Sequence, residues 1–377
     1  MSLRVCHTPS EWAQSVRAGV PGRSAVLTIG TFDGVHLGHQ QILRKVVEVA
    51  RQSAHPTVAG AVTFDPHPSR GLRPEHAPPM IATLAQRLEG FERCGLEAVL
   101  VLKFDLPLAH LSAEAFVNSI LVEQLYTSAV LVGENFRFGH RQAGDVLMLT
   151  ERGQRFGFAV EVVPPVKVNG EIVSSTAIRR AIEAGDVARA AALLGRPFAL
   201  TGDVVPGSGQ GRKHLVPTLN LAHEQELLPR YGVYVTEVEV ASAPVAGDDR
   251  PAASGRSPVT DHRSPATDHR PPDETFRAVT NVGVRPTLDG AKLAVESHLL
   301  DVANALAPNV ARELAPNVNR NLTAGRSREN SRATRMTVRF LSRLRDEKKF
   351  ESLDALREQI HRDIAAAGEY FTASAAR

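Results

Sequence analysis

The run Gly30-Thr-Phe-Asp-Gly-Val-His36-Leu-Gly38-His39 decides how the N-terminal half of this chain is interpreted. It follows Ala25–Gly30, an apolar run that predicts a buried strand. A helical pattern comes next, whose apolar face consists of Leu43, Val46, Val47 and Ala50. Open α/β sheets bind phosphates where a strand passes into the next helix. The run therefore predicts a nucleotide site.

The two histidines of this run suit adenylyl transfer. His36 and His39 are three residues apart, so in a first helical turn they share a face. Imidazoles beside helix-terminal N–H groups can stabilise the charge that develops on an α-phosphate under attack. We expect Gly30, Phe32 and Asp33 to bind the nucleotide, and Gly38 to leave room for it. The alternative is that the histidines are solvated turn residues.

The rest of the first half alternates strands and helices. Strands are predicted at 58–64, 98–104, 129–133 and 158–163, and helices at 83–93, 113–125 and 145–152. Repeated βα units of this kind predict a mostly parallel sheet covered on both faces.

After about Gly195 short β-type runs dominate. They lie at 199–205, 232–240, 275–282, 294–300 and 336–342. This pattern predicts a small antiparallel barrel or sandwich, closed by a helix over Ser352–Ala366. We expect one domain over 1–187, a linker over 188–198 and a second domain over 199–377.

Two low-complexity segments interrupt the second half, at 241–273 and 303–334. Each contains a near-duplication, RSPVTDHRSPATDHRPP and LAPNVARELAPNVNRNL. The first segment is predicted to be disordered because it cannot bury enough apolar surface. Both are interpreted as lengthened hairpin loops, which cost little free energy.

Composition limits the classes of protein. The 377 residues carry a net charge of +3, and the sequence pI is about 9.0. This mild basic excess suits nucleotides as well as nucleic acid. Two cysteines, Cys6 and Cys94, argue against a disulfide framework and a zinc cluster. No apolar run reaches the roughly 18 residues of a membrane span. The expectation is a cytoplasmic protein that binds neither nucleic acid nor membrane; a weak homo-oligomer is left open.

A second phosphate-binding element is expected at Ser174-Ser175-Thr176-Ala-Ile-Arg179. Ser175 is predicted to cap a helix that Thr176 opens, and their hydroxyls can hold the β- and γ-phosphates. Arg179, one turn later, supplies a cation for the pyrophosphate leaving group. The alternative is an ordinary capped helix with a surface arginine.

Two polar residues and two aromatic residues add to this half. Asn135 is a candidate contact to a nucleotide or a flavin phosphate. Asp65 either orients a substrate or caps the turn at Pro66. Phe136 and Phe138 are expected in the core rather than against a flavin.

The second half contains its own candidate site. A glycine-rich stretch can wrap phosphates with its backbone amides, through Gly207, Gly209, Gly211 and Arg212. Thr218 and Asn220 alternate along a predicted strand, so both oxygens face one way and suit Mg²⁺. Glu296 can accept the proton of a hydroxyl that attacks a γ-phosphate. The run Asn281–Thr287 is interpreted as a turn near the same site. The alternatives are that Thr218 and Asn220 cap a turn and that Glu296 is a solvated strand residue.

These motifs resemble those of the prokaryotic bifunctional flavokinases and FAD synthetases. The resemblance covers GTFDGVHLGHQ at 30–40, the segments at 63–68, 132–139, 174–179, 217–220 and 294–298, and the run Phe340–Phe350. It implies a Rossmann-like α/β/α nucleotidyltransferase domain and a six-stranded antiparallel β-barrel riboflavin kinase domain with a terminal helix. It also implies that Thr218 and Asn220 bind Mg²⁺, that Glu296 is the catalytic base and that Arg345 lies near the flavin, for which Asp65 is a further candidate.

The implied activity has two steps, each of which uses ATP and Mg²⁺. Riboflavin is phosphorylated to FMN, and FMN is then adenylylated to FAD with release of pyrophosphate. The chain departs from the family at Leu215–Val216 and lacks a D-L-Y-G turn after the strand with Glu296. An FAD synthetase with a degenerate kinase module is therefore the main alternative. The others are an adenylyltransferase for another substrate and a nucleic-acid binder that uses the basic insert.

Overall fold

The computed structural model describes residues 2–17, 20, 22–72, 74–205, 218–241, 274–287, 290–300 and 335–375. The chain divides into two compact units. The first unit comprises Met1–Ala184, Ala188–Arg196 and Gln225–Leu228. The second comprises Gly185–Val187, Pro197–Glu224 and Pro229–Arg377.

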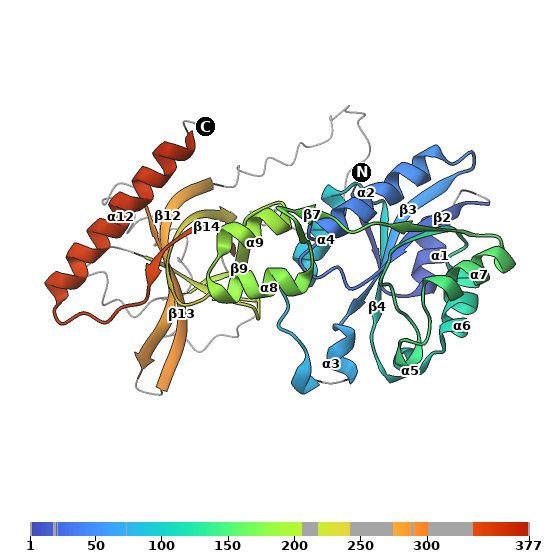
Figure 1. The fold of residues 1–377 in the computed structure, drawn as a ribbon, viewed down its shortest axis with the longest axis horizontal. Coiled ribbons are helices and arrows are strands. Elements are labelled where there is room, and N and C mark those ends of the chain that lie inside the picture. The colour runs from blue at the N-terminus through green and yellow to red at the C-terminus, as the bar shows by residue number, and fades with distance from the viewer. Residues whose placement is uncertain are drawn as a thin grey trace, which may run out of the picture. The chain divides into compact units, whose positions relative to one another are not determined.

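The first unit is built on a six-stranded parallel sheet (Figure 1). Its strands are β1 (Arg4–Cys6), β2 (Ser24–Ile29), β3 (Thr57–Asp65), β4 (Ala98–Lys103), β5 (Thr127–Gly133) and β6 (Ala159–Val163). Their order is β1-β4-β3-β2-β5-β6, and every neighbouring pair is parallel. The order reverses between β2 and β5. In open sheets of this kind ligands bind beyond the carboxyl ends of the strands at such a reversal.

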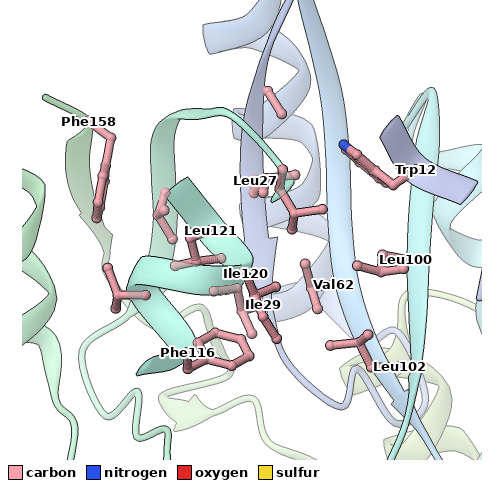
Figure 2. Packing of buried hydrophobic residues seen from close by; sticks show 14 of the residues in the cluster. Trp12, Leu27, Ile29, Val62, Leu100, Leu102, Phe116, Ile120, Leu121 and Phe158 are labelled. Carbon is pink, nitrogen blue, oxygen red and sulfur yellow. The ribbon is translucent and has the colours of Figure 1, made fainter. Parts of the chain in front are cut away.

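Helices cover both faces of the sheet, as the sequence predicted. On one face lie α1 (Pro9–Arg17), η2 (Phe116–Gln124) and α7 (Val146–Phe156); on the other lie α2 (Leu37–Gln52) and α4 (Leu84–Arg93). Figure 2 shows the first core, with Trp12 and Phe158 at its two ends. Leu27 belongs to this core, whereas its neighbour Val26 belongs to the other. Alternate residues of β2 are therefore buried on opposite faces.

Shorter elements complete the first unit. They are α3 (Pro68–Leu72), η1 (Pro74–His76), α5 (Leu106–His110), α6 (Ala113–Ala115), η3 (His140–Gln142), the hairpin β7 (Lys167–Val168) and β8 (Glu171–Ile172), α8 (Ser175–Ala184) and α9 (Val187–Leu194).

The second unit is a closed antiparallel barrel with the strand order β10-β13-β12-β11-β14-β9. Its strands are β9 (Phe198–Val205), β10 (Leu219–His223), β11 (Gly232–Ala241), β12 (Glu274–Thr287), β13 (Gly290–Leu299) and β14 (Arg335–Asp346). The helix α12 (Leu353–Ala375) follows β14. Its Ala367 and Phe371 pack on the outer side of the barrel against Val233, Val235 and Val279. The predicted pair of an α/β domain and a six-stranded barrel is confirmed.

Three details differ from the sequence interpretation. Most of the expected linker at 188–198 is helical, because α9 ends only at Leu194. The predicted turn at Asn281–Thr287 is wrong, since β12 continues through it and pairs with β13. The terminal helix is longer than expected and ends at Ala375. The low-complexity segments 241–273 and 303–334 lie almost entirely outside the described residues, and their predicted loop character is not tested.

Among the described residues, no helix is both long enough and apolar enough to cross a membrane.

The buried face of α2 allows a test of the first core. Leu43 is 0% exposed, whereas Arg44 beside it is exposed. We expect Leu43→Ala to destabilise the first unit by about 3 kcal/mol, because truncation leaves a cavity. Arg44→Ala should cost no more than about 0.5 kcal/mol. Urea unfolding followed by the fluorescence of Trp12, the only tryptophan of the chain, measures both. Equal losses would contradict the assigned packing.

Candidate active sites

The run after β2 is a tight, strained junction at the carboxyl edge of the sheet. Gly34 has φ 81°, and the non-glycine residues Phe32 and Val35 adopt φ 50° and φ 39°. Left-handed backbone is costly for a β-branched residue such as Val35 and for an aromatic one. Buried contacts hold it in place: Phe32 is 2% exposed and Val35 is 1% exposed. Strain of this kind gathers at functional sites.

His36 and His39 meet at the start of α2, as predicted. Their rings stack with centroids 3.6 Å apart and an interplanar angle of 18°. His36 caps the helix, because its Nδ1 accepts a hydrogen bond from the backbone N–H of His39 at 3.3 Å. A neutral ring whose Nδ1 accepts must carry its proton on Nε2. His36 can therefore donate a hydrogen bond through Nε2.

Both rings are held neutral. Burial, and next the charge of Arg196, lower the pKa of His36 to about 4, and the charge of Arg179 acts in the same direction. Burial and the neighbouring His36 keep the pKa of His39 well below its ordinary value. The buried Nδ1 of His39 has no hydrogen-bond partner within the described part of the chain. A buried polar atom without a partner is uncommon in native proteins and is consistent with a bound ligand.

Gly38 leaves room for the ring of His36, and the room expected there for a nucleotide stays a prediction. A Cβ at this position would lie 3.2 Å from Cε1 and 3.3 Å from Nδ1 of His36. Phe32 completes the surroundings of the pair, with its ring edge-on to that of His39 at 5.2 Å. A larger residue between the histidines would therefore crowd the His36 ring at the helix start.

Asp33 is an internal anchor in this structure. Its side chain is 1% exposed and accepts backbone N–H bonds from Ile81 at 3.0 Å and Ala82 at 3.1 Å. Its Oδ2 also accepts from Nη2 of Arg179 at 2.6 Å. The carboxylate thus joins three segments at the edge of the sheet, and the nucleotide contact expected of Asp33 stays a prediction.

The helix α8 begins one residue earlier than predicted. Ser174, not Ser175, acts as its cap, because the Ser174 hydroxyl accepts from the backbone N–H of Ala177 at 3.2 Å. The hydroxyl of Ser175 donates to the Asp33 carbonyl at 3.0 Å. Thr176 is exposed in the first turn, where its hydroxyl and the helix N–H groups can meet a phosphate. Both expected helix-start residues thus lie beside the His36 run.

Two arginines that no sequence motif marked, the buried Arg87 and the half-buried Arg196, hold this edge together. Arg87 donates to the carbonyls of Thr31 at 3.1 Å and Phe64 at 3.1 Å, and to Asp65 Oδ1 at 3.0 Å. Arg196 donates to the carbonyl of Gly34 at 2.7 Å. Neither arginine lies in a recognisable sequence motif. Each is recognised only from its contacts to segments that are distant in the sequence.

Asp65 and Asn135 follow two other strands at the same edge. Asp65 ends β3, and 47% of its side chain is exposed despite its ion pair with Arg87. Asn135 lies in an exposed turn just after β5, the neighbour of β2 across the order reversal. Phe138 is buried in the core with Phe136 packed against it, which confirms their predicted core position.

In the second unit, strand pairing gathers the candidate kinase residues. Asn220 on β10 is directly opposite Glu296 on β13, and Glu296 is directly opposite Asn281 on β12. All three are partly exposed, whereas their neighbours Leu219, Ser297 and Thr280 are buried. The three therefore face outward from the barrel wall, and this row is named the kinase row below. Thr218 directly precedes β10, two residues before Asn220.

A chain of hydroxyls crosses the inside of the same wall. Thr280 and Ser297, which are opposite each other on β12 and β13, share a hydrogen bond of 2.8 Å. Thr236 on β11 joins Thr280 at 2.7 Å. All three side chains are 0% exposed. A shift of the strand register by one residue would move every side chain of a strand to the opposite face of the barrel wall. These internal hydrogen bonds therefore help to fix the register that forms the kinase row.

Arg345 on β14 lies at the far end of the same row, but its side chain already has a partner. In the strand register Arg345 is opposite Val233 of β11, which is itself opposite Asn281. Its Nη2 forms an ion pair with Asp363 of α12 at 2.7 Å. In this structure it fixes α12 to β14, and the expected flavin contact is a proposal only. The candidates Gly207, Gly209, Gly211 and Arg212 lie outside the described residues.

The donor atoms fit a divalent metal bound together with ATP phosphates. Asn220 supplies an amide oxygen and Thr218 a hydroxyl, which are ligand types that Mg²⁺ accepts. Within the described residues no group of three or more His, Cys, Asp or Glu could hold a metal ion. Mg²⁺ in such sites keeps several waters and takes its remaining ligands from the substrate, so few protein ligands suffice.

Comparisons with known proteins agree with this division. Residues 21–177 match the family model for FAD synthetase, and residues 194–371 match that for riboflavin kinase. The chain is 32% identical to a bifunctional riboflavin kinase/FMN adenylyltransferase of Escherichia coli K12, over 93% of this chain and 94% of the relative. It is 34% identical to the protein of the same description from Pseudomonas fluorescens, over 94% and 96%.

A solved structure shares the fold. It is described as a macrolide-efflux protein from Streptococcus pneumoniae and is 25% identical to this chain. The match has a TM-score of 0.71 and covers 97% of this chain and 99% of that one.

The neutral histidines make the stability of the first unit depend on pH. The unfolded chain binds a proton at each histidine near pH 6.5, whereas folded His36 binds one only near pH 4. Stability must therefore fall as the pH drops through this window, for His36 by roughly 2 kcal/mol between about pH 7 and about pH 5. His36→Asn, which keeps a capping side chain, should remove most of that loss. Urea unfolding followed by Trp12 fluorescence measures it.

The control is His55→Asn, because His55 is exposed and distant in sequence from the site. This variant should lose as much stability as the parent protein between the two pH values. A parent protein with no loss of stability over this range would show that the pair is protonated in the folded state.

Proposed function

The chain belongs to the family of bifunctional riboflavin kinases/FMN adenylyltransferases, and we propose that the first unit adenylylates FMN and the second phosphorylates riboflavin. The enzyme uses ATP to make FMN from riboflavin and then FAD from FMN. One observation carries the assignment of sites. The stacked histidines lie wholly in the first unit, and Asn220 opposite Glu296 lies wholly in the second.

For adenylylation we infer that FMN's own phosphate attacks the α-phosphorus of ATP, so that a P–O bond forms and pyrophosphate leaves. Nε2–H of His36 donates to the α-phosphate oxygens as their charge grows, and His39 is stacked beside it. The start of α8 offers Thr176 and free N–H groups to the outer phosphates. Arg179 supports the leaving pyrophosphate from its position beside Asp33. Asp65 and Asn135 are the proposed flavin and nucleotide contacts.

For phosphorylation we infer that the primary hydroxyl of riboflavin attacks the γ-phosphorus of ATP. Its proton passes to the carboxylate of Glu296, the bond to the β-phosphate oxygen breaks and ADP leaves. Thr218 and Asn220 would hold Mg²⁺, which neutralises phosphate charge when bound. The glycine-rich stretch with Gly207, Gly209, Gly211 and Arg212 is proposed to wrap the phosphates. We also propose a cytoplasmic enzyme, since both reactions consume ATP.

Single substitutions should separate the two activities. His36→Ala should lower FAD formation from FMN by about 100-fold or more, the effect of losing a donor to a developing charge. Riboflavin phosphorylation should be unchanged. Glu296→Ala should give the reverse. Chromatography of the flavin products, started from riboflavin and separately from FMN, measures both activities. Loss of both activities in a folded variant would contradict the division of labour.

The metal site has a test of its own. Asn220→Ala should raise the Mg²⁺ concentration needed for half-maximal riboflavin phosphorylation by about tenfold, because one oxygen ligand is lost. The Mg²⁺ dependence of FAD formation from FMN should stay the same in this variant. A matched control is Asn118→Ala, an amide in η2 of the first unit. An unchanged Mg²⁺ requirement for phosphorylation in Asn220→Ala would remove Asn220 from the metal site.

A further inference from the structure

We propose that Asn281 is a positioning residue of the kinase site that orients the carboxylate of Glu296. This inference rests on the proposed function, in which Glu296 is the base. Sequence interpretation placed Asn281 in a turn, whereas the structure places it within β12, directly opposite Glu296. In Figure 1, β12 and β13 are the two orange strands that lie side by side.

The alternation of the strands puts both side chains on one face. Thr280 and Val282, which flank Asn281, are each 0% exposed, and Val295 and Ser297, which flank Glu296, are 1% and 0% exposed. Asn281 and Glu296 therefore both point out of the barrel. Directly opposite residues of antiparallel strands have Cβ atoms about 5 Å apart. An amide and a carboxylate can reach each other across that distance.

The register that pairs them is fixed from inside the barrel. The Thr280–Ser297 hydrogen bond of 2.8 Å joins the next residue pair along the same two strands. Both hydroxyls are fully buried, so a slip would leave them without each other in an apolar interior. Asn281 is thus held beside Glu296 by bonds that are independent of any substrate.

The two amide side chains of the kinase row, Asn281 and Asn220, have different proposed roles. A carboxylate only accepts hydrogen bonds, and the amide nitrogen of Asn281 can donate to it. Asn220 flanks Glu296 on the other side, and its oxygen is assigned to Mg²⁺. A donor on the Asn281 side fixes one carboxylate oxygen and leaves the other for the substrate hydroxyl.

Other charged groups lie near the row. His298 is two residues beyond Glu296 on β13. The Glu347 carboxylate lies over Gly283 on β12, where a Cβ would collide with it. Arg345 stands at the other end of the row, held by Asp363. These groups are the same in the parent protein and in Asn281 variants, so they do not account for a difference between them.

The test compares steady-state riboflavin phosphorylation in Asn281→Ala, Asn281→Asp and the parent protein. We expect Asn281→Ala to lower kcat by about 10- to 100-fold, as for loss of one hydrogen bond to a charged group, with a smaller change in KM for riboflavin. FAD formation from FMN serves as the internal control and should be unchanged. Glu237→Gln, an outward-facing change on β11 away from the row, should leave both activities unchanged.

A conservative variant separates positioning from a general loss of structure. Asn281→Gln keeps an amide donor on a longer side chain and should recover part of the kcat lost in Asn281→Ala, whereas Asn281→Asp, which has no donor when ionised, should not. Equal kcat values in Asn281→Ala and Asn281→Gln would overturn the proposal.

A double variant separates this inference from the proposed function. If Glu296→Gln is inactive as a kinase, adding Asn281→Ala should cause no further loss, because the two residues act as one unit. An inactive Glu296→Gln together with a fully active Asn281→Ala would overturn the role of Asn281 alone. A fully active Glu296→Gln would overturn the proposed base, and with it this inference.

Discussion

Strand pairing is the constraint on which both candidate sites depend. In the parallel sheet, pairing brings the carboxyl ends of β2, β3 and β5 to one edge, so that runs far apart in sequence meet there. In the barrel, antiparallel pairing sets Asn220, Glu296 and Asn281 in one row. Each site is thus assembled from residues that are far apart in the sequence. The backbone hydrogen bonds between strands set the relative positions of these residues.

Buried charged groups connect the segments at the edge of the parallel sheet. Asp33 and Arg179 form an ion pair whose side chains are 1% and 12% exposed, and Arg87 is 2% exposed. Burying charges costs free energy unless each is well bonded, and a partly bonded cluster would destabilise the fold. Here the backbone amides of Ile81 and Ala82 supply further bonds to Asp33. These bonds connect the histidine run to α8, although the buried Nε of Arg87 has no partner among the described residues.

Much of the fold could be predicted because hydrophobic periodicity reports burial directly. The four residues chosen for the apolar face of α2, from Leu43 to Ala50, are the ones that the structure buries. The histidine pair was also found, since its spacing and its place after a strand are local. Arg87, Arg196 and the Asn281 pairing were missed because they depend on contacts between segments distant in sequence. Ser175 was predicted as the helix cap, whereas Ser174 is the cap in the structure. Two adjacent serines have the same intrinsic preference for the capping position, so the sequence alone could not distinguish them.

The orientation of the His36 ring decides where the protons of adenylylation come from. Its Nδ1 is engaged by the backbone of α2 and its Nε2 holds a hydrogen, so the ring offers no lone pair for proton abstraction. In the proposed adenylylation the phosphate of FMN therefore cannot lose a proton to His36, and its second ionisation, near pH 6 for a phosphate monoester, must occur in solution or through another group.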